Sequence, residues 1–342
     1  MDFNKNSFDE LGRLINGSPR NVIIATHTNP DGDAIGSSLA WKAFLESKGH
    51  TVNCVIPNRF PDFLDWLEGA SEMKIYKNEP QEVAALVSKA EIIFCLDFNQ
   101  IQRLEGLGEC IEANKHSKFV LIDHHLSPPP GIFDLEISYS TCSSTSYLVY
   151  CIIEQLEGVE IITKEMAEQL YVGIMTDTGN FSFSFLTSDL FRAVAVLVDK
   201  GIDIPYINRM VYHSYTVGRL KLLGHTLNNM QTFKAGKEQA AYMTLKESEL
   251  RRFHFQPGDS EGFVNYPLSI KGLALSAIFI ETKDFIRISF RSRIDVDANV
   301  FASLYFNGGG HKNASGGKSF VSMEETVKKY RDSVSEFFAK DK

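Results

Sequence analysis

Apolar residues in the first 200 positions form short continuous runs, separated by longer stretches in which they recur at helical spacing. The short runs predict buried strands at residues 22–25, 52–56, 92–96 and 119–122. The helical spacing predicts helices at residues 35–48, 82–89, 143–156, 164–175 and 188–200. Continuous apolar runs are typical of strands covered on both faces, and helices between them act as crossover connections. The pattern therefore predicts an α/β fold, a parallel sheet with helices on both faces.

The pattern changes after residue 200. Residues 201–230 mix polar and apolar positions at helical period and predict a linker helix, with Pro205 near its start. Shorter strands are then expected at residues 239–244, 273–281 and 285–291, before a glycine-rich loop at 307–317 and a closing helix at 323–338. We therefore expect a first domain at residues 1–200, the linker helix at 201–230, and a smaller α+β domain at 231–342.

Composition indicates an ordinary globular protein. Hydrophobic residues make up 44% and charged residues 23% of the chain, outside the range of disordered sequences. No signal peptide is visible, and no apolar run approaches the roughly 20 residues that a membrane helix needs. The five cysteines are odd in number and include no Cys-x-x-Cys pair, which favours reduced thiols. We expect a cytoplasmic protein without a membrane partner.

Charge is unevenly distributed along the chain. The net charge is −8, of which residues 1–220 carry about −12 and residues 221–342 about +4. An acidic first part repels long polyanions unless cations neutralise it, whereas a mildly basic second part can attract phosphate. This asymmetry favours a metal-loading domain followed by an anion-holding domain, and it argues against long duplex nucleic acid as a partner.

Polar residues that could bind a metal or take part in catalysis follow the predicted strands or lie in a helical turn. They are His27, Asp31 and Asp33 after the first strand, Asp97 after the third, Asp123, His124 and His125 after the fourth, and Asp177. In an open α/β sheet the ligand crevice lies at the carboxyl ends of the strands, so these residues are expected to converge. Each has an ordinary explanation by itself, such as a helix cap or an Asp-Gly turn. Their joint occurrence favours a functional site.

Aspartates and histidines gathered in one crevice would repel or destabilise one another without cations. Carboxylate and imidazole together are the ligand set of Mn²⁺, Fe²⁺ or Zn²⁺. Two such ions, roughly 3.5–4 Å apart and bridged by one carboxylate, form a clamp for in-line displacement at phosphorus. The residues therefore predict a two-metal phosphoesterase.

Three motifs resemble those of the DHH/DHHA1 phosphoesterases. They are the string from His27 to Ser37, the triplet Asp123-His124-His125, and the glycine-rich string from Gly308 to Gly317. The resemblance covers nearly the whole chain. In length and layout the chain is most similar to the stand-alone branch of nano-RNases (short-oligoribonucleotide nucleases) and pAp phosphatases.

The resemblance implies two metal sites that share a bridging carboxylate. The first site would contain His27, Asp31 and Asp97, and the second Asp33, Asp97, His124 and Asp177. His125 would face the scissile phosphate, and Asp123 would support the neighbouring histidines as a hydrogen-bond acceptor. The expected cofactor is a pair of Mn²⁺ ions, with Mg²⁺, Co²⁺ or Fe²⁺ as substitutes.

Two features of the second half predict phosphate binding. The strand at 285–291 alternates, so Arg287, Ser289 and Arg291 share one face and can grip phosphate. In the glycine-rich loop, exposed N–H groups and the side chain of Lys312 offer donors. A salt-bridged solvent face or a plain tight turn would be the ordinary alternatives. Similarity to the DHHA1 module favours nucleotide binding, which adds Gly309, Gly310 and His311 to the expected substrate residues. The substrate would lie between the domains, its far end held by Arg291 and His311.

The substrates implied are oligoribonucleotides of roughly two to five nucleotides and 3'-phosphoadenosine 5'-phosphate. Hydrolysis of cyclic dinucleotides is the closest alternative, because it needs the same two modules. A pyrophosphatase would have a different second domain, and a long-strand exonuclease would need further nucleic-acid-binding domains. A nucleotide sensor without catalysis is disfavoured by the intact acidic set. The oligomeric state is left open, with a homodimer as one option.

Overall fold

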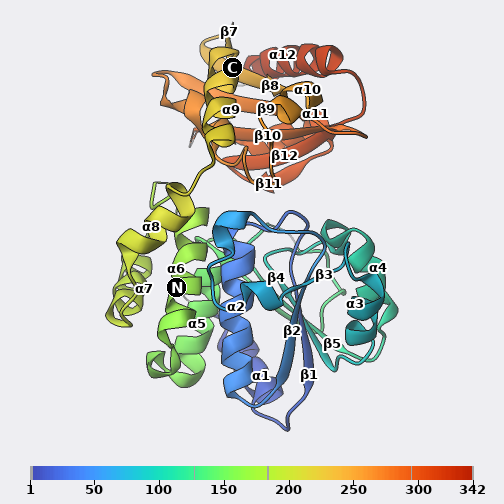
Figure 1. Ribbon diagram of the computed structural model, residues 1–342, viewed down its shortest axis with the longest axis vertical. Coiled ribbons are helices and arrows are strands. Elements are labelled where there is room, and N and C mark those ends of the chain that lie inside the picture. The colour runs from blue at the N-terminus through green and yellow to red at the C-terminus, as the bar shows by residue number, and fades with distance from the viewer. Residues whose placement is uncertain (1–2, 127, 183–184, 294, 341–342) are drawn as a thin grey trace. The chain divides into compact units, whose positions relative to one another are not determined.

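The computed structural model describes residues 3–126, 128–182, 185–293 and 295–340, and it divides into two compact units, Met1–Ser214 and Tyr215–Lys342. The first unit, residues 1–214 in Figure 1, contains a six-stranded sheet. The strand order is β3-β2-β1-β4-β5-β6, and all neighbouring strands are parallel. Its strands are β1 (Asn21–Ala25), β2 (Thr51–Ile56), β3 (Lys74–Ile75), β4 (Ile92–Leu96), β5 (Lys118–Asp123) and β6 (Leu135–Ser138). The predicted parallel sheet is confirmed. The sequence pattern did not predict β3 and β6, because these edge strands are too short to show a period.

Alternate residues of the strands enter two separate cores, which places helices on both faces of the sheet. Ile24 belongs to the core cluster beneath one set of helices, namely α1 (Lys5–Ile15), α2 (Gly32–Ser47), α5 (Thr145–Glu157), α6 (Lys164–Asp177), α7 (Ser188–Asp199) and α8 (Ile204–Tyr212). Ile23 belongs to the opposite cluster, which is covered by α3 (Pro80–Val87) and α4 (Gly106–Ala113). The α/β prediction with helices on both faces is therefore confirmed.

Helices α2, α5 and α6 approach one another closely at two glycines. A Cβ atom on Gly36 would lie 2.3 Å from the carbonyl oxygen of Gln169, and one on Gly173 would lie 1.9 Å from Oγ of Ser146. Real Cβ atoms are not found at such distances. The absence of a side chain at these positions lets the three helices meet directly, and two of the predicted site residues, Asp33 and Asp177, lie on α2 and α6.

The second unit contains a mixed six-stranded sheet in the order β11-β12-β10-β9-β8-β7, parallel only between β8 and β9. Its elements are α9 (Val217–Asn228), β7 (Gln231–Ala235), β8 (Glu238–Leu245), α10 (Glu247–Arg252), β9 (Leu273–Glu281), β10 (Ile286–Ser292), α11 (Ala298–Phe306), β11 (Gly309–His311), β12 (Ala314–Ser319) and α12 (Met323–Lys340). Phe290, Phe301 and Tyr330 form a core between the sheet and helices α11 and α12. A second core with Leu222 and Phe263 lies on the other face, beneath α9.

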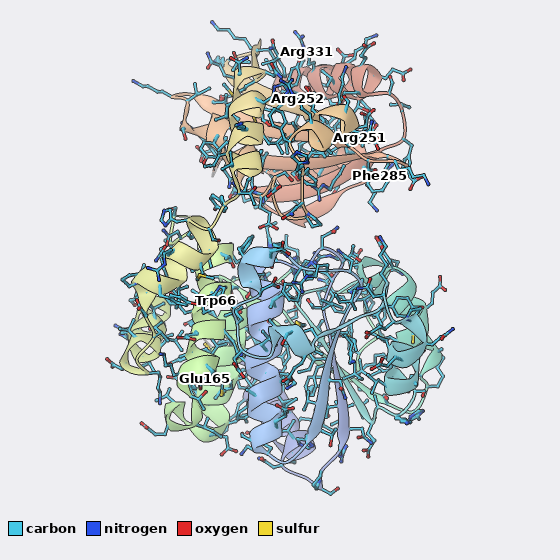
Figure 2. The ribbon with its side chains drawn as sticks, in the orientation of Figure 1. Trp66, Glu165, Arg251, Arg252, Phe285 and Arg331 are labelled. Carbon is cyan, nitrogen blue, oxygen red and sulfur yellow. The ribbon has the colours of Figure 1, made fainter. Side chains whose placement is uncertain are left out.

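Residues 201–230, expected as one linker helix, form two helices, α8 and α9, and the boundary between the units lies between them. Helix α8 belongs to the first unit, where the ring of Tyr206 meets that of Trp66 edge-on with centroids 5.3 Å apart. Trp66 is labelled in Figure 2. Thr216 starts α9 as an N-cap, because its side chain accepts a hydrogen bond from the N–H of Arg219. Helical spacing continues through the break, so the pattern alone could not show it.

The glycine-rich segment at 307–317, expected as a loop, is mainly a hairpin of β11 and β12. The prediction of a loop was wrong, because glycines carry no side chain whose alternation would reveal a strand. They are required for close packing instead. A Cβ on Gly308 would lie 1.9 Å from the carbonyl oxygen of Gly316.

Within the described ranges, no helix combines the length and the apolar character that crossing a membrane requires. The five cysteines all lie within the described ranges, and none of them forms a disulfide.

Candidate metal centre

Strands β1 and β4 are neighbours in the sheet, and the order of the strands reverses between them. Ligands bind at such a switch point in open α/β sheets, beyond the carboxyl ends of the strands. His27 follows β1 and Asp97 follows β4. Asp31 is the N-cap of α2, and its Oδ1 accepts hydrogen bonds from the N–H groups of Asp33 and Ala34 at 3.0 and 3.1 Å. Asp31 therefore caps the helix through Oδ1 alone of its two carboxylate oxygens, as far as the described residues show.

Asp97 has a strained backbone. Its φ of +65° lies in the left-handed region, which costs a non-glycine residue about 1–3 kcal/mol. The N–H of Asp97 donates to the carbonyl of Ile122 in β5 at 3.1 Å, so the end of β5 helps to hold this conformation. Residues in such regions cluster at functional sites, which makes Asp97 the first residue to test.

The structure brings the predicted metal ligands together in two groups. One group contains His27, Asp31 and Asp97, and the other contains Asp33, His124 and Asp177. In each group one ligand atom per residue lies within 4.8 Å of the others. Asp97 faces both groups with different oxygens: Oδ2 lies 3.4 Å from Nε2 of His27, and Oδ1 lies 3.4 Å from Nε2 of His124. This geometry suits a carboxylate shared by two cations.

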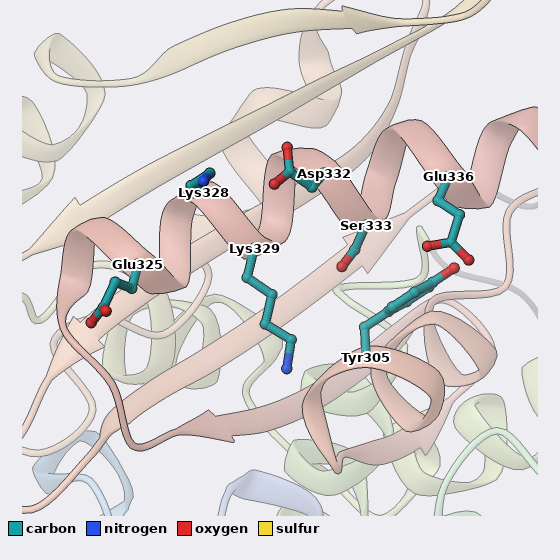
Figure 3. A pocket seen from close by; sticks show the side chains of 7 residues that line it. All are labelled: Tyr305, Glu325, Lys328, Lys329, Asp332, Ser333 and Glu336. Atoms are coloured by element: carbon teal, nitrogen blue, oxygen red, sulfur yellow. The ribbon is translucent and has the colours of Figure 1, made fainter.

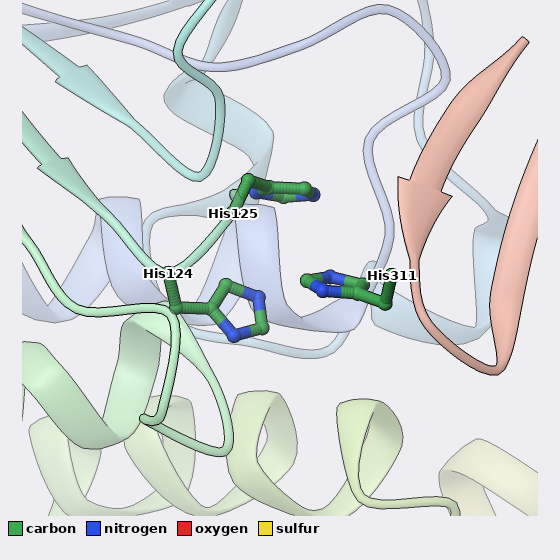
Figure 4. Close-up of side chains that lie close together, drawn as sticks. All are labelled: His124, His125 and His311. Atoms are coloured by element: carbon green, nitrogen blue, oxygen red, sulfur yellow. The ribbon is translucent and has the colours of Figure 1, made fainter. Parts of the chain in front are cut away.

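His125 points Nδ1 of its ring at Asp123, and the same nitrogen lies 3.8 Å from Oδ1 of Asp97. Nδ1 of His125 lies 2.7 Å from Oδ1 of Asp123, and the backbone N–H of His125 donates to Oδ2 at 3.0 Å. The rings of His124 and His125 meet edge-on with centroids 5.0 Å apart (Figure 4). Asp123 is fully buried, so its carboxylate fixes the orientation of one histidine of the triplet.

The carboxylates perturb one another strongly. Burial raises the pKa of Asp33 well above 3.8, and the charges of Asp97 and Asp177 raise it further. Burial also opposes ionisation of Asp97, but hydrogen bonds from His124 and His27 outweigh it and hold the pKa of Asp97 well below 3.8. Among the described residues, no lysine or arginine nitrogen lies within 4 Å of these two buried carboxylates, and only imidazole nitrogens do. Divalent cations would relieve this repulsion.

Two residues at the start of α5 hold the aspartates and were not predicted. The N–H groups of Thr145 and Ser146 donate to Oδ2 and Oδ1 of Asp33 at 2.7 and 2.8 Å. The hydroxyl of Thr145 donates to Oδ1 of Asp97 at 2.9 Å. The run Ser143-Ser144-Thr145-Ser146 at a predicted helix start was the available signal, but it also fits ordinary capping by Ser144.

Arg103 is a further residue that the sequence did not single out. It lies on the 3₁₀ helix Ile101–Leu104, and its carbonyl accepts a hydrogen bond from the N–H of Thr28 at 2.8 Å. Its Nη1 lies 3.2 Å from Nε2 of His125 and 3.5 Å from the carbonyl oxygen of Asp97. An arginine six residues after an aspartate does not form a sequence motif that indicates a functional site, so only the fold reveals this contact.

The sequence matches the N-terminal domain of the DHH family over residues 21–174 and the DHHA1 domain over residues 237–340. It is 31% identical to the bifunctional oligoribonuclease and PAP phosphatase NrnA of Thermus thermophilus, over 86% of this chain and 83% of that protein. The chain belongs to the DHH family. The NrnA protein of Bacillus subtilis is 28% identical over 89% of this chain and 90% of its own length. A crystal structure of an exopolyphosphatase-related protein from Bacteroides fragilis is 38% identical, has a TM-score of 0.90, and covers 98% of this chain and 97% of that chain.

The donor set of the DHH domain fits the metal ions on which DHH phosphoesterases depend. Carboxylate and imidazole ligands suit Mn²⁺, Fe²⁺ or Zn²⁺, and exclusive Mg²⁺ sites seldom recruit histidine. His27, Asp31 and Asp97 would hold one ion, and Asp33, Asp97, His124 and Asp177 the other.

The predicted substrate residues of the DHHA1 domain lie on β10, on β11 and in the turn after it. Burial alternates along β10, so Arg287, Ser289 and Arg291 share the less buried face, as predicted. Ala314 on β12 pairs with Arg291 on β10 and with His311 on β11. The side chains of Arg291 and His311 therefore point to the same face of the sheet, about 10 Å apart. Lys312 is exposed in the turn of the hairpin.

Burial lowers the pKa of Arg287 from its ordinary value. Nη2 of this arginine donates to Oγ of Ser260 at 3.1 Å, and its buried Nε has no hydrogen-bond partner among the described residues. The DHHA1 domain therefore contains an arginine whose hydrogen-bonding capacity the described chain only partly uses.

A surface pocket of about 350 Å³ in the DHHA1 domain lies between helices α11 and α12, away from the predicted substrate residues. It is lined by Tyr305, Glu325, Lys328, Lys329, Asp332, Ser333 and Glu336 (Figure 3). Three acidic and two basic side chains line it, so it offers no net positive charge to a phosphate. None of the predicted site residues lines this pocket.

Proposed function

We propose that this protein is a two-metal phosphoesterase that hydrolyses oligoribonucleotides of roughly two to five nucleotides and 3'-phosphoadenosine 5'-phosphate. The observation that carries the proposal is Asp97, whose two oxygens face the two groups of potential metal ligands. The similarity to bifunctional oligoribonucleases and PAP phosphatases over most of the chain supports the substrate class.

The proposed cofactor is a pair of Mn²⁺ ions, which polarise phosphoryl oxygens and lower the pKa of water when bound. The chain itself provides positioning. Asp97 keeps the two groups of ligands at a fixed separation, and Thr145 holds the Asp97 carboxylate through its hydroxyl. Asp123 orients His125 beside them, so that the imidazole can face the phosphate that is cleaved.

The DHHA1 domain is proposed to bind the part of the nucleotide that is not cleaved. Arg287, Ser289 and Arg291 provide donors on one strand, and His311 extends the same row two strands away. In the neighbouring row, opposite Ser289, lie Gly316 on β12 and then Gly309 on β11, which have no side chains. A phosphate or ribose can therefore reach backbone groups on this surface. Gly310 and Lys312 complete the proposed set.

A product-resolved assay tests the proposed function. The substrates are 3'-phosphoadenosine 5'-phosphate, RNA from dinucleotides to about 24-mers, and a cyclic dinucleotide, all with the same Mn²⁺ concentration. We expect kcat/KM to fall steeply beyond about five nucleotides, because the first unit is acidic and few phosphates can be contacted. Equal kcat/KM on a trimer and a 24-mer would indicate a long-strand exonuclease instead, and preference for the cyclic substrate would indicate a cyclic-dinucleotide hydrolase.

Asp97→Ala should abolish hydrolysis of every substrate and lower the Mn²⁺ content, because it removes the shared carboxylate. Asp199→Ala is the matched control, since Asp199 is exposed at the end of α7. An Asp97→Ala variant that keeps more than roughly a tenth of the wild-type kcat would contradict the two-metal scheme.

A further inference from the structure

Arg103 lies beside the candidate metal centre but forms no ion pair with it. Five aspartates of the site lie on the surrounding elements, yet within the described ranges no carboxylate oxygen approaches the Arg103 guanidinium to within 4 Å. The side chain is half-buried. A guanidinium that is partly withdrawn from water and lacks an anionic partner is a favourable place for an anion to bind.

The two contacts of Arg103 engage only one of its nitrogens. Nη1 contacts Nε2 of His125 at 3.2 Å and the carbonyl oxygen of Asp97 at 3.5 Å. The Nε and Nη2 groups have no hydrogen-bond partner in the described part of the chain. These two nitrogens form the edge of the guanidinium that binds two oxygens of one phosphate or carboxylate group.

The hydrogen bonds of His125 fix the direction of its contact with Arg103. The carboxylate of Asp123 is the acceptor for Nδ1 of His125 at 2.7 Å, so Nδ1 carries the proton. A guanidinium can only donate, so Nε2 of His125 accepts from Nη1 of Arg103. Asp123, His125 and Arg103 thus form a chain of hydrogen bonds that holds the guanidinium. The backbone carbonyl of Arg103 also accepts a hydrogen bond from Thr28, in the loop after β1.

We propose that Arg103 binds the phosphate group that lies at the metal centre, using its Nε and Nη2 groups. The inference rests on the proposed function, and it adds a cationic residue from the chain itself to an otherwise acidic site. Arg103 neutralises part of the phosphate charge, and His125 acts as the positioning residue that orients the guanidinium.

Binding of inorganic phosphate to the Mn²⁺-loaded full chain tests this assignment by calorimetry. Arg103→Ala should weaken phosphate binding roughly 10- to 100-fold, the loss expected for hydrogen bonds to a charged group. Arg103→Lys should restore only part of the affinity, because an ammonium group lacks the two-nitrogen edge. The stoichiometry and affinity of Mn²⁺ should match the wild type in both variants. Arg192→Ala, on the exposed side of α7, is the control arginine.

Phosphate binding by Arg103→Ala within twofold of the wild type would overturn the assignment, and so would a wild-type protein that binds no phosphate. Loss of Mn²⁺ binding in Arg103→Ala would show that the residue acts only by supporting the ligands. Arg103→Ala should also weaken phosphate binding when it is added to His125→Ala. If the double variant bound phosphate as tightly as His125→Ala alone, direct contact between Arg103 and phosphate would be overturned.

Hydrolysis of RNA dinucleotides and 3'-phosphoadenosine 5'-phosphate is measured on the same samples. Phosphate binding that depends on Arg103, in a wild-type protein that hydrolyses neither substrate, would refute the proposed function and leave the role of Arg103 intact. Hydrolysis by the wild type together with unchanged phosphate binding in Arg103→Ala would support the proposed function and refute the role of Arg103.

Discussion

At the scale of single residues, Thr145 offers a test of how the carboxylates are held. Its hydroxyl donates to Oδ1 of Asp97 at 2.9 Å, and valine has the same shape without the donor. Thr145→Val should lower Mn²⁺ affinity roughly 10- to 100-fold, the usual effect of losing a group that orients a metal ligand. Thr145→Ser keeps the hydroxyl and should stay near the wild type. Equal Mn²⁺ affinities for the valine and serine variants in calorimetry would contradict this role.

His124 gives the site a predictable pH dependence. Burial lowers its pKa, but Asp177, Asp97 and Asp33 outweigh burial and raise it well above 6.5. A raised pKa in the folded state stabilises the metal-free protein fully below pH 6.5, and this contribution is lost as the pH rises from 6.5 through the folded-state pKa. Thermal melts of the metal-free protein should therefore show a loss of stability across that interval.

Mn²⁺ competes with the proton of His124 for the same imidazole. The apparent affinity for Mn²⁺ should therefore rise as the pH increases from 6.5 through the folded-state pKa of His124, and binding should release protons. His124→Asn should reduce both effects, which melts and calorimetry in buffers of different ionisation enthalpy can measure. A variant that melts with the same pH dependence as the wild type would show that other groups are responsible.

At the scale of elements, the meeting of α2, α5 and α6 decides whether the ligands converge. A Cβ on Gly173 would lie 1.9 Å from Oγ of Ser146 and 2.9 Å from Oδ1 of Asp33. Gly173→Ala should lower the free energy of unfolding by about 1–3 kcal/mol through overpacking, and it should reduce Mn²⁺ affinity because Asp33 must move. Denaturant unfolding and calorimetry measure the two effects.

Gly224→Ala provides a control of the opposite sign. Gly224 lies inside helix α9, and nothing lies within 4 Å of the position of its Cβ. Alanine there should stabilise the protein by about 0.5–1 kcal/mol, because it favours the helix over the unfolded chain. If both substitutions shifted stability in the same direction, close packing at Gly173 would not be the cause.

At the scale of the whole molecule, the proposed division of labour predicts a ratio of two activities. Arg291→Ala and His311→Ala should lower kcat/KM on an RNA dinucleotide roughly 10- to 100-fold, since each removes a charged hydrogen bond to a remote phosphate. A small chromogenic phosphodiester has no remote phosphate, so its hydrolysis should be nearly unchanged. His124→Ala should impair both substrates alike, because it removes a metal ligand. If all three variants lowered both activities equally, the DHHA1 residues would belong to catalysis or stability.

The sequence by itself determined much of this protein. Continuous apolar runs predicted four strands of the parallel sheet, because strands buried on both faces cannot alternate. The histidines and aspartates at the strand ends predicted that the ligands converge, because parallel strands present their carboxyl ends at one edge. The resemblance to the DHH family implied how they divide into two groups. Tertiary structure alone decided the rest. Arg103, Thr145 and Gly173 act through partners that are distant in sequence, and no local period encodes such contacts. The break between α8 and α9 and the strands of the glycine-rich hairpin were likewise hidden, because uninterrupted helical spacing and missing side chains leave no pattern to read.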